Sequence, residues 1–156
     1  MGSDPEARIG YGYDLGSGET TWHLANAPEY GLPELPWLVD DDFTESLEKH
    51  LLTTLGEFTE TDYRAEGYFE REGAAKQRVG VRLDRSGTWD YTGHILVAIN
   101  SRQAVEWSET LTLDLEFMTG AGRLSTWDGQ LNAALSLLGL TPTQDRPRWL
   151  VYPFYG

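Results

Sequence analysis

A chain of 156 residues that is 40% hydrophobic and 12% aromatic has the length and composition of one folded domain, not of a disordered acidic tail. It contains no cysteine, which excludes disulfide bonds, thiolate nucleophiles and cysteine-bound metal centres. Its formal net charge of −13 argues against binding to nucleic acid or to anionic membrane surfaces, because both need lysine and arginine to displace counterions.

The negative charge is concentrated in the first part of the chain. Residues 1–62 hold 14 Asp and Glu against 2 Lys and Arg, whereas residues 63–103 are slightly basic. Such an asymmetry is evidence about partners and solubility, and it says nothing about fold. The start of the chain has neither a basic region nor an apolar run, so we expect no signal peptide and a cytoplasmic protein. We expect a single domain over residues 1–156, with residues 1–7 disordered.

The first predicted element is a strand over residues 8–14, where isoleucine and tyrosine alternate with glycine. Gly10 and Gly12 fall on one face of this strand, which leaves room for another group to lie close against it. Residues 27–37 contain three prolines and are predicted to form an irregular surface loop.

Two helices are predicted next. The first covers residues 42–55, because its apolar side chains recur every four positions. Asp42 provides its N-cap, and Gly56 stands where a helix commonly ends on glycine. The second covers residues 64–78, although its two glycines weaken it.

Strands dominate the following part of the chain. Residues 79–84 and 94–100 are predicted to form a hairpin, and residues 103–107 a further strand. Apolar residues alternate strictly between positions 111 and 117, which predicts a strand and leaves a short helix open.

A helix over residues 127–138 is predicted near the C-terminus, with Ser125 or Thr126 as its N-cap. Residues 148–155 are almost wholly apolar and predict a last strand, which Pro153 allows at an edge of the sheet but not as a long central strand. Together the elements indicate an α+β domain, with a mostly antiparallel sheet of about four to five strands and about three helices packed on one face.

Several patterns that suggest chemistry have simpler explanations. The letters D-L-G-S-G at residues 14–18 resemble the first phosphate loop of the actin and sugar-kinase ATPases, but that fold needs two lobes and a much longer chain. Asp42, Ser46 and His50 share one helix stripe, but a hydrolytic triad needs the imidazole between the hydroxyl and the carboxylate. The three histidines are scattered without metal-ligand spacing. We therefore expect no catalytic residue, no cofactor and no metal.

Aromatic and acidic side chains occur together in the first third of the chain. Such a mixture makes a surface for a cationic ligand or for a basic protein segment, whereas the alternative is that most of these rings form the core. Tyr30 and Trp37 lie in the proline-rich loop, so we expect them to be exposed. The candidate partner-binding residues are Tyr30, Trp37, Asp40, Asp41 and Asp42.

Three stretches carry a resemblance: residues 8–16 (RIGYGYDLG), 58–69 (FTETDYRAEGYF) and 139–156 (GLTPTQDRPRWLVYPFYG). In the order and style of these blocks the chain resembles small uncharacterised proteins of actinobacteria and their phages. The resemblance implies a compact intracellular domain and no particular activity.

The leading hypothesis from the sequence is a non-enzymatic accessory protein, of phage or mobile-element origin, whose acidic N-terminal part binds a basic partner. A second hypothesis is a small enzyme or ligand-binding domain with a pocket beside the Gly10 and Gly12 strand. A third is a structural or assembly subunit whose last strand pairs between chains. The sequence names neither the partner nor the oligomeric state.

Overall fold

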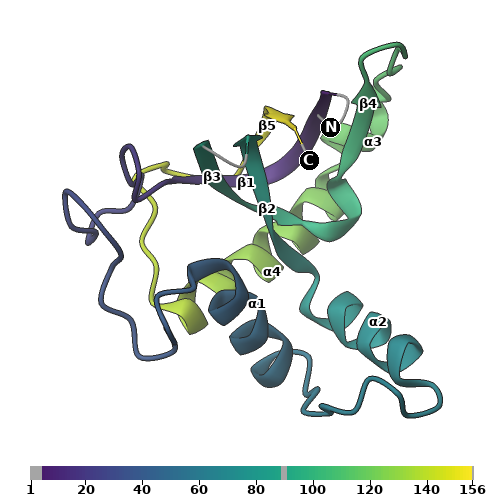
Figure 1. Cartoon of the computed structure of the whole chain (residues 1–156). Coiled ribbons are helices and arrows are strands. Elements are labelled where there is room, and N and C mark those ends of the chain that lie inside the picture. The colour runs from purple at the N-terminus through teal and green to yellow at the C-terminus, as the bar shows by residue number, and fades with distance from the viewer. Residues whose placement is uncertain (1–4, 89–90, 156) are drawn as a thin grey trace.

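The computed structural model describes residues 5–88 and 91–155, which form an α+β fold around one five-stranded sheet (Figure 1). The strand order is β3-β2-β5-β1-β4, and the ladders are antiparallel except where β2 meets β5. This is the predicted fold class. In chain order the elements are β1 (Glu6–Gly16), α1 (Phe43–Thr54), α2 (Tyr68–Val79), β2 (Val81–Thr88), β3 (Tyr91–Ala98), the 3-10 helix η1 (Ile99–Ser101), β4 (Gln103–Glu106), α3 (Leu115–Thr119), α4 (Ala121–Leu138) and β5 (Arg148–Phe154).

β1 holds the sheet together because it pairs with three other strands. From Glu6 to Gly12 it pairs with β5, and over the first part of that stretch it also pairs with β4. From Gly12 to Gly16 it pairs instead with β3. The change of partner requires β1 to bend, and the sheet curls so that β3 closes onto β1 (Figure 1).

The glycines of β1 permit this closure. A Cβ atom on Gly12 would lie 1.9 Å from the carbonyl oxygen of Leu96, and one on Gly10 would lie 2.7 Å from Cγ1 of Val97. The group that lies close against the glycine face is therefore β3 itself. At these two positions the space on the glycine face is therefore filled by β3 and holds no ligand pocket.

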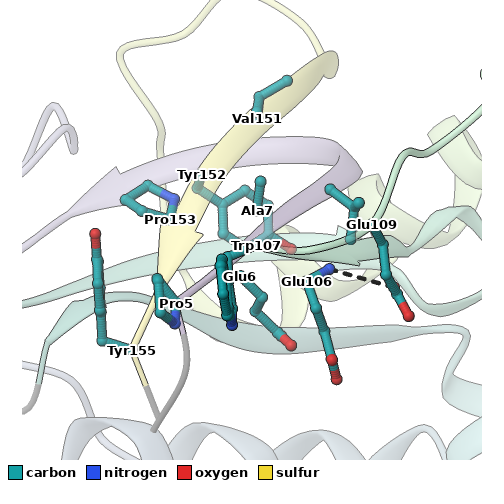
Figure 2. Close-up of a pocket in the computed structure, with 11 residues that line it drawn as sticks. Pro5, Glu6, Ala7, Glu106, Trp107, Glu109, Val151, Tyr152, Pro153 and Tyr155 are labelled. Carbon is teal, nitrogen blue, oxygen red and sulfur yellow. Dashed lines mark hydrogen bonds between the residues drawn. The ribbon is translucent and has the colours of Figure 1, made fainter. Parts of the chain in front are cut away.

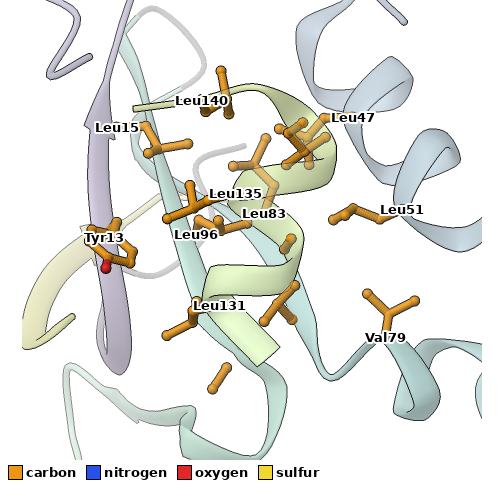
Figure 3. Packing of buried hydrophobic residues seen from close by; sticks show 14 of the residues in the cluster. Tyr13, Leu15, Leu47, Leu51, Val79, Leu83, Leu96, Leu131, Leu135 and Leu140 are labelled. Carbon is orange, nitrogen blue, oxygen red and sulfur yellow. The ribbon is translucent and has the colours of Figure 1, made fainter. Parts of the chain in front are cut away.

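The main core lies between the sheet and the helices (Figure 3). Leu15 of β1 and Leu96 of β3 meet Leu47 of α1 and Leu131 of α4 there, and all four side chains are 0% exposed. Burying a leucine side chain contributes about 2 kcal/mol to stability. The packing of α1 and α4 against the sheet therefore supplies much of the stability of the fold.

A buried aspartate fastens the opposite side of the sheet. The side chain of Asp84 on β2 accepts a hydrogen bond from the Tyr152 hydroxyl at 2.6 Å and from Nη1 of Arg8 at 3.2 Å. Arg102 donates to both of its oxygens at 3.3 Å. β2 and β5 share only one residue pair, so these side-chain bonds join the two strands where backbone pairing is short. An apolar cluster beside them is formed by Ile95, Val97 and Tyr152.

The helix predicted over residues 42–55 is α1, and its N-cap is the predicted one. Oδ1 of Asp42 accepts a hydrogen bond from the Glu45 amide at 3.0 Å. Gly56 follows the helix but is not the left-handed residue, which is Glu57 with φ 51°. Gly56 is needed for space, because a Cβ atom there would lie 2.6 Å from a carbonyl oxygen of the helix.

Two other helices begin where the sequence did not indicate. α2 begins at Tyr68 rather than at residue 64, because Gly67 before it has a left-handed φ of 75°. α4 begins at Ala121, so Ser125 and Thr126 lie inside the helix instead of capping it. The Thr126 hydroxyl donates to the carbonyl oxygen one turn earlier at 3.1 Å, as hydroxyl residues inside helices do.

Two strand predictions need correction, while the predicted hairpin of β2 and β3 is confirmed. The strand predicted between positions 111 and 117 is wrong, and the short helix that was left open is α3. Asp114 caps it by accepting a hydrogen bond from the Phe117 amide at 3.2 Å. β5 is not an edge strand, because it lies between β2 and β1. Pro153 fits there because β2 pairs with β5 only at Phe154.

The start of the chain is more ordered than expected. Glu6 pairs with Phe154 and Ala7 with Pro153, so β1 already begins within the segment predicted to be disordered. The first four residues of that segment lie outside the described residues.

Candidate functional site

An acidic hollow lies between the turn after β1, the loop before α1 and the start of β3. Its volume is about 550 Å³, and we define it by its lining residues, 17–19, 22, 31–32, 40–44, 92 and 94. Three of the predicted partner-binding residues, Asp40, Asp41 and Asp42, therefore share one surface depression. Glu19, in the turn after β1, also lines it.

The three aspartates are held by a tight turn. The amide of Asp42 donates to the carbonyl oxygen of Val39 at 3.1 Å, and Asp40 and Asp41 between them have φ of 54° and 56°. Positive φ at both central residues defines a turn that aspartate and asparagine tolerate better than most residues. Ser46 of α1 locks the turn, because its Oγ accepts from the Val39 amide at 3.0 Å and donates to the Val39 carbonyl at 3.2 Å.

The acidic hollow has no compensating positive charge among the described residues. It is lined by four carboxylates and by no lysine or arginine, and none of the four takes part in an ion pair there. Its single histidine, His94, stacks on Trp22 at 5.4 Å and has Nδ1 3.0 Å from the Gly16 carbonyl oxygen. Burial lowers the pKa of His94, so the ring is neutral at pH 7 and leaves the hollow negative.

The two aromatic residues predicted to bind a partner, Tyr30 and Trp37, differ in their exposure to solvent. Tyr30 is 78% exposed and precedes Gly31 at the rim of the acidic hollow. Trp37 is half-buried, which corrects the expectation that it is exposed. Its Nε1 donates to the Leu138 carbonyl oxygen at 2.8 Å, and its ring stacks on His50 at 6.1 Å. Trp37 borders a different hollow and does not contribute to the acidic one.

The residues of the possible triad have other partners. Asp42 caps α1, the Ser46 hydroxyl is bonded to the backbone of Val39, and His50 lies against Trp37. No proton relay joins these three described side chains. In the part of the chain that the structure describes, no group of three or more histidine, aspartate or glutamate side chains is placed to hold a metal ion.

A second surface depression, which the sequence did not indicate, lies at the far end of the sheet. This sheet-end groove of about 470 Å³ is lined by residues 5–7, 105–107, 109, 151–153 and 155 (Figure 2). Trp107 and Val151 are 70% and 72% exposed there. In the sequence Trp107 stands between Glu106 and Glu109, but only the fold exposes it and brings these residues next to β5.

Comparison of the chain with protein-family models, curated proteins and solved structures finds no match. Over residues 5–88 and 91–155, no helix is long and apolar enough to cross a membrane.

Proposed function

We propose that this protein is a non-enzymatic interaction protein that binds a basic partner through the acidic hollow. One observation carries the proposal: four carboxylates surround the hollow without a lysine or arginine to neutralise them. The cost of bringing like charges together falls when a cationic group enters, so a lysine or arginine side chain of a partner is the matching ligand.

The construction of the site supports a binding role. Asp40 and Asp41 lie in a turn that Ser46 fastens to α1, so the backbone that carries their carboxylates is already fixed before a partner binds. Preorganised charges lose less entropy on binding than mobile ones. Partner proteins carrying lysine or arginine on an exposed segment are the class we expect, in keeping with an accessory factor of a phage or mobile element.

The test is binding of a synthetic lysine-rich peptide without apolar residues, measured by calorimetry at low and at high salt. We expect binding to weaken steeply with salt, because exposed charges are screened within about 3 Å at 1 M ionic strength. Changing Asp40→Asn and Asp41→Asn together should weaken binding about tenfold at low salt. Asparagine tolerates the same left-handed backbone, so the turn is retained. Asp42 is left unchanged because it caps α1.

The control is the double change Glu66→Gln and Glu70→Gln, which alters the net charge by the same amount. Both side chains are exposed, and neither lines the acidic hollow. We expect this control to change binding less than twofold. Equal weakening in the two double variants, or binding that is insensitive to salt, would show that the hollow is not the binding site.

A further inference from the structure

The sheet-end groove continues the face of the sheet that the helices cover elsewhere. Ala7 lies opposite Val105 of β4 and Pro153 of β5, and directly paired residues share a face. Along β1 this face continues to Tyr11 and Tyr13, which are buried against the helices. At Ala7 and Val105 the row is only half-buried, and the residues that line the groove there belong to strands and loops and not to a helix.

Large apolar side chains gather around this row. Val151 is 72% exposed, Trp107 70% and Tyr155 44%. All three line one groove, with Pro5 and Pro153 between them. Scattered single apolar residues are common on protein surfaces, whereas a contiguous group in a depression marks an interaction site. An exposed tryptophan is also the residue type most often found at the energetic centre of an interface.

The rim of the groove is acidic. Glu6, Glu106 and Glu109 line it, and no lysine or arginine does. Glu6 forms an ion pair with Arg8, two residues further along β1. Glu106 and Glu109 form no ion pair among the described residues, and Oε2 of Glu109 lies 3.4 Å from the Glu106 amide. The groove therefore combines an apolar floor with unneutralised negative charge.

This charge identifies the kind of occupant. Two copies of the chain meeting through the groove would place the glutamates of one against those of the other, and each copy carries a formal charge of −13. Like charges in contact disfavour such a dimer. A segment that presents apolar side chains between lysines or arginines matches both the apolar floor and the negative charge of the groove. β4 is the last strand in the sheet order and among the described residues pairs only with β1, so an extended segment can also add to its other edge.

We propose that the sheet-end groove binds an extended segment of a partner protein in which apolar residues alternate with lysine or arginine. The segment places its apolar side chains on Trp107 and Val151 and its cations beside Glu106 and Glu109. This inference goes beyond the proposed function, because the acidic hollow contributes no residue to the groove. Either surface can therefore be tested while the other is intact.

The probe is a short synthetic peptide in which leucine and arginine alternate, titrated into the isotopically labelled protein. We expect the backbone amide signals of Ala7, Val105 and Val151 to shift. Trp107→Ser and Val151→Glu should each weaken binding at least tenfold, because each removes an exposed apolar side chain that lines the groove. Both side chains are mostly exposed, so the folded state should be retained, which melting monitored by circular dichroism checks.

Two controls separate this proposal from the first. The peptide with glutamate in place of arginine should not bind, and the pair of changes Asp40→Asn and Asp41→Asn should leave binding of the leucine–arginine peptide within twofold. Signal changes confined to the acidic hollow would overturn the proposal. It would also be overturned by binding that survives both Trp107→Ser and Val151→Glu, or by a dimer in sedimentation that Val151→Glu abolishes.

Discussion

Asp84 is a buried side chain to which three residues from distant parts of the chain are hydrogen-bonded. Its side chain is 1% exposed, and an ion so removed from water is tolerated only when it is paired and fully hydrogen-bonded. Arg8, Arg102 and Tyr152 meet that need from three different parts of the chain. The same contact explains the Tyr152 hydroxyl, because burial and the bond to Asp84 both raise the pKa of Tyr152. The hydroxyl is therefore a fixed donor at neutral pH.

We predict that Asp84→Asn lowers the free energy of unfolding by about 3 kcal/mol, because Arg8 and Arg102 lose the buried charge that pairs them. Urea unfolding followed by circular dichroism measures this directly. The matched control is Asp145→Asn, which removes an exposed partner of Arg148 and should leave stability unchanged within error. A loss no larger than that of the control would mean that water already satisfies these guanidinium groups.

β1 is the element whose sequence is most constrained by its neighbours. An alternating strand can be recognised locally, but its glycines have meaning only once β3 is in place. Gly12 has backbone atoms of β3 on its open side, and these cannot move aside as a flexible side chain would. By contrast, Gly73 in α2 has nothing within 4 Å of the position of a Cβ atom. The same residue type is thus essential in one element and replaceable in another.

We predict opposite effects for the two alanine substitutions. Gly12→Ala should lower the free energy of unfolding by more than about 3 kcal/mol or prevent folding, because overpacking against backbone cannot relax. Gly73→Ala should raise it by about 1 kcal/mol, since alanine is favoured over glycine inside a helix. Urea titrations of both variants at the same pH give the comparison. Little change in Gly12→Ala would show that the closure of β3 onto β1 is looser than the structure indicates.

The molecule as a whole is an acidic protein in which buried tyrosines of β1 lie between the sheet and the helices. Tyr11 is 8% exposed, and its hydroxyl donates to Oδ1 of Asp128 on α4 at 2.7 Å. Burial, and next the bond to Asp128, raise the pKa of Tyr11 to about 12. Burial also raises the pKa of Tyr13. Folding is therefore linked to the protonation of tyrosines, and the alkaline range is where the whole molecule should become less stable.

The direction of this pH dependence follows from the pKa of Tyr11 in the unfolded and in the folded protein. An unfolded tyrosine ionises near its ordinary pKa of about 10, whereas folded Tyr11 holds its proton to about pH 12. The stabilising contribution is complete below pH 10 and is lost as pH rises toward 12, amounting to about 3 kcal/mol. We predict that Tyr11→Phe is less stable than the unaltered protein at pH 8 and that this difference shrinks above pH 10. Urea unfolding across that range measures it, and a difference independent of pH would contradict the linkage.

Local patterns in the sequence were sufficient for the fold class, for α1 with its Asp42 cap and for the concentration of negative charge near the N-terminus. These features depend on residues a few positions apart, through the period of a helix, the alternation of a strand or a cap three residues from its partner. The turn that gathers Asp40 and Asp41 is also local, which is why the acidic part of the candidate site was predictable. The exposure of Trp37 was not, because Leu138 that accepts its hydrogen bond is distant in the chain.

The bend of β1, the Asp84 network and the sheet-end groove were decided only by the tertiary structure. Tyr152 reaches Asp84 across a separation of 68 residues, and the groove joins the first described residues to the last strand. Short-range periodicity places a side chain on one face of its own element, but it does not say which distant strand lies opposite or at what register. Those choices depend on how the whole sheet curves and packs, and they determine which charges are neutralised and which apolar surface is left open.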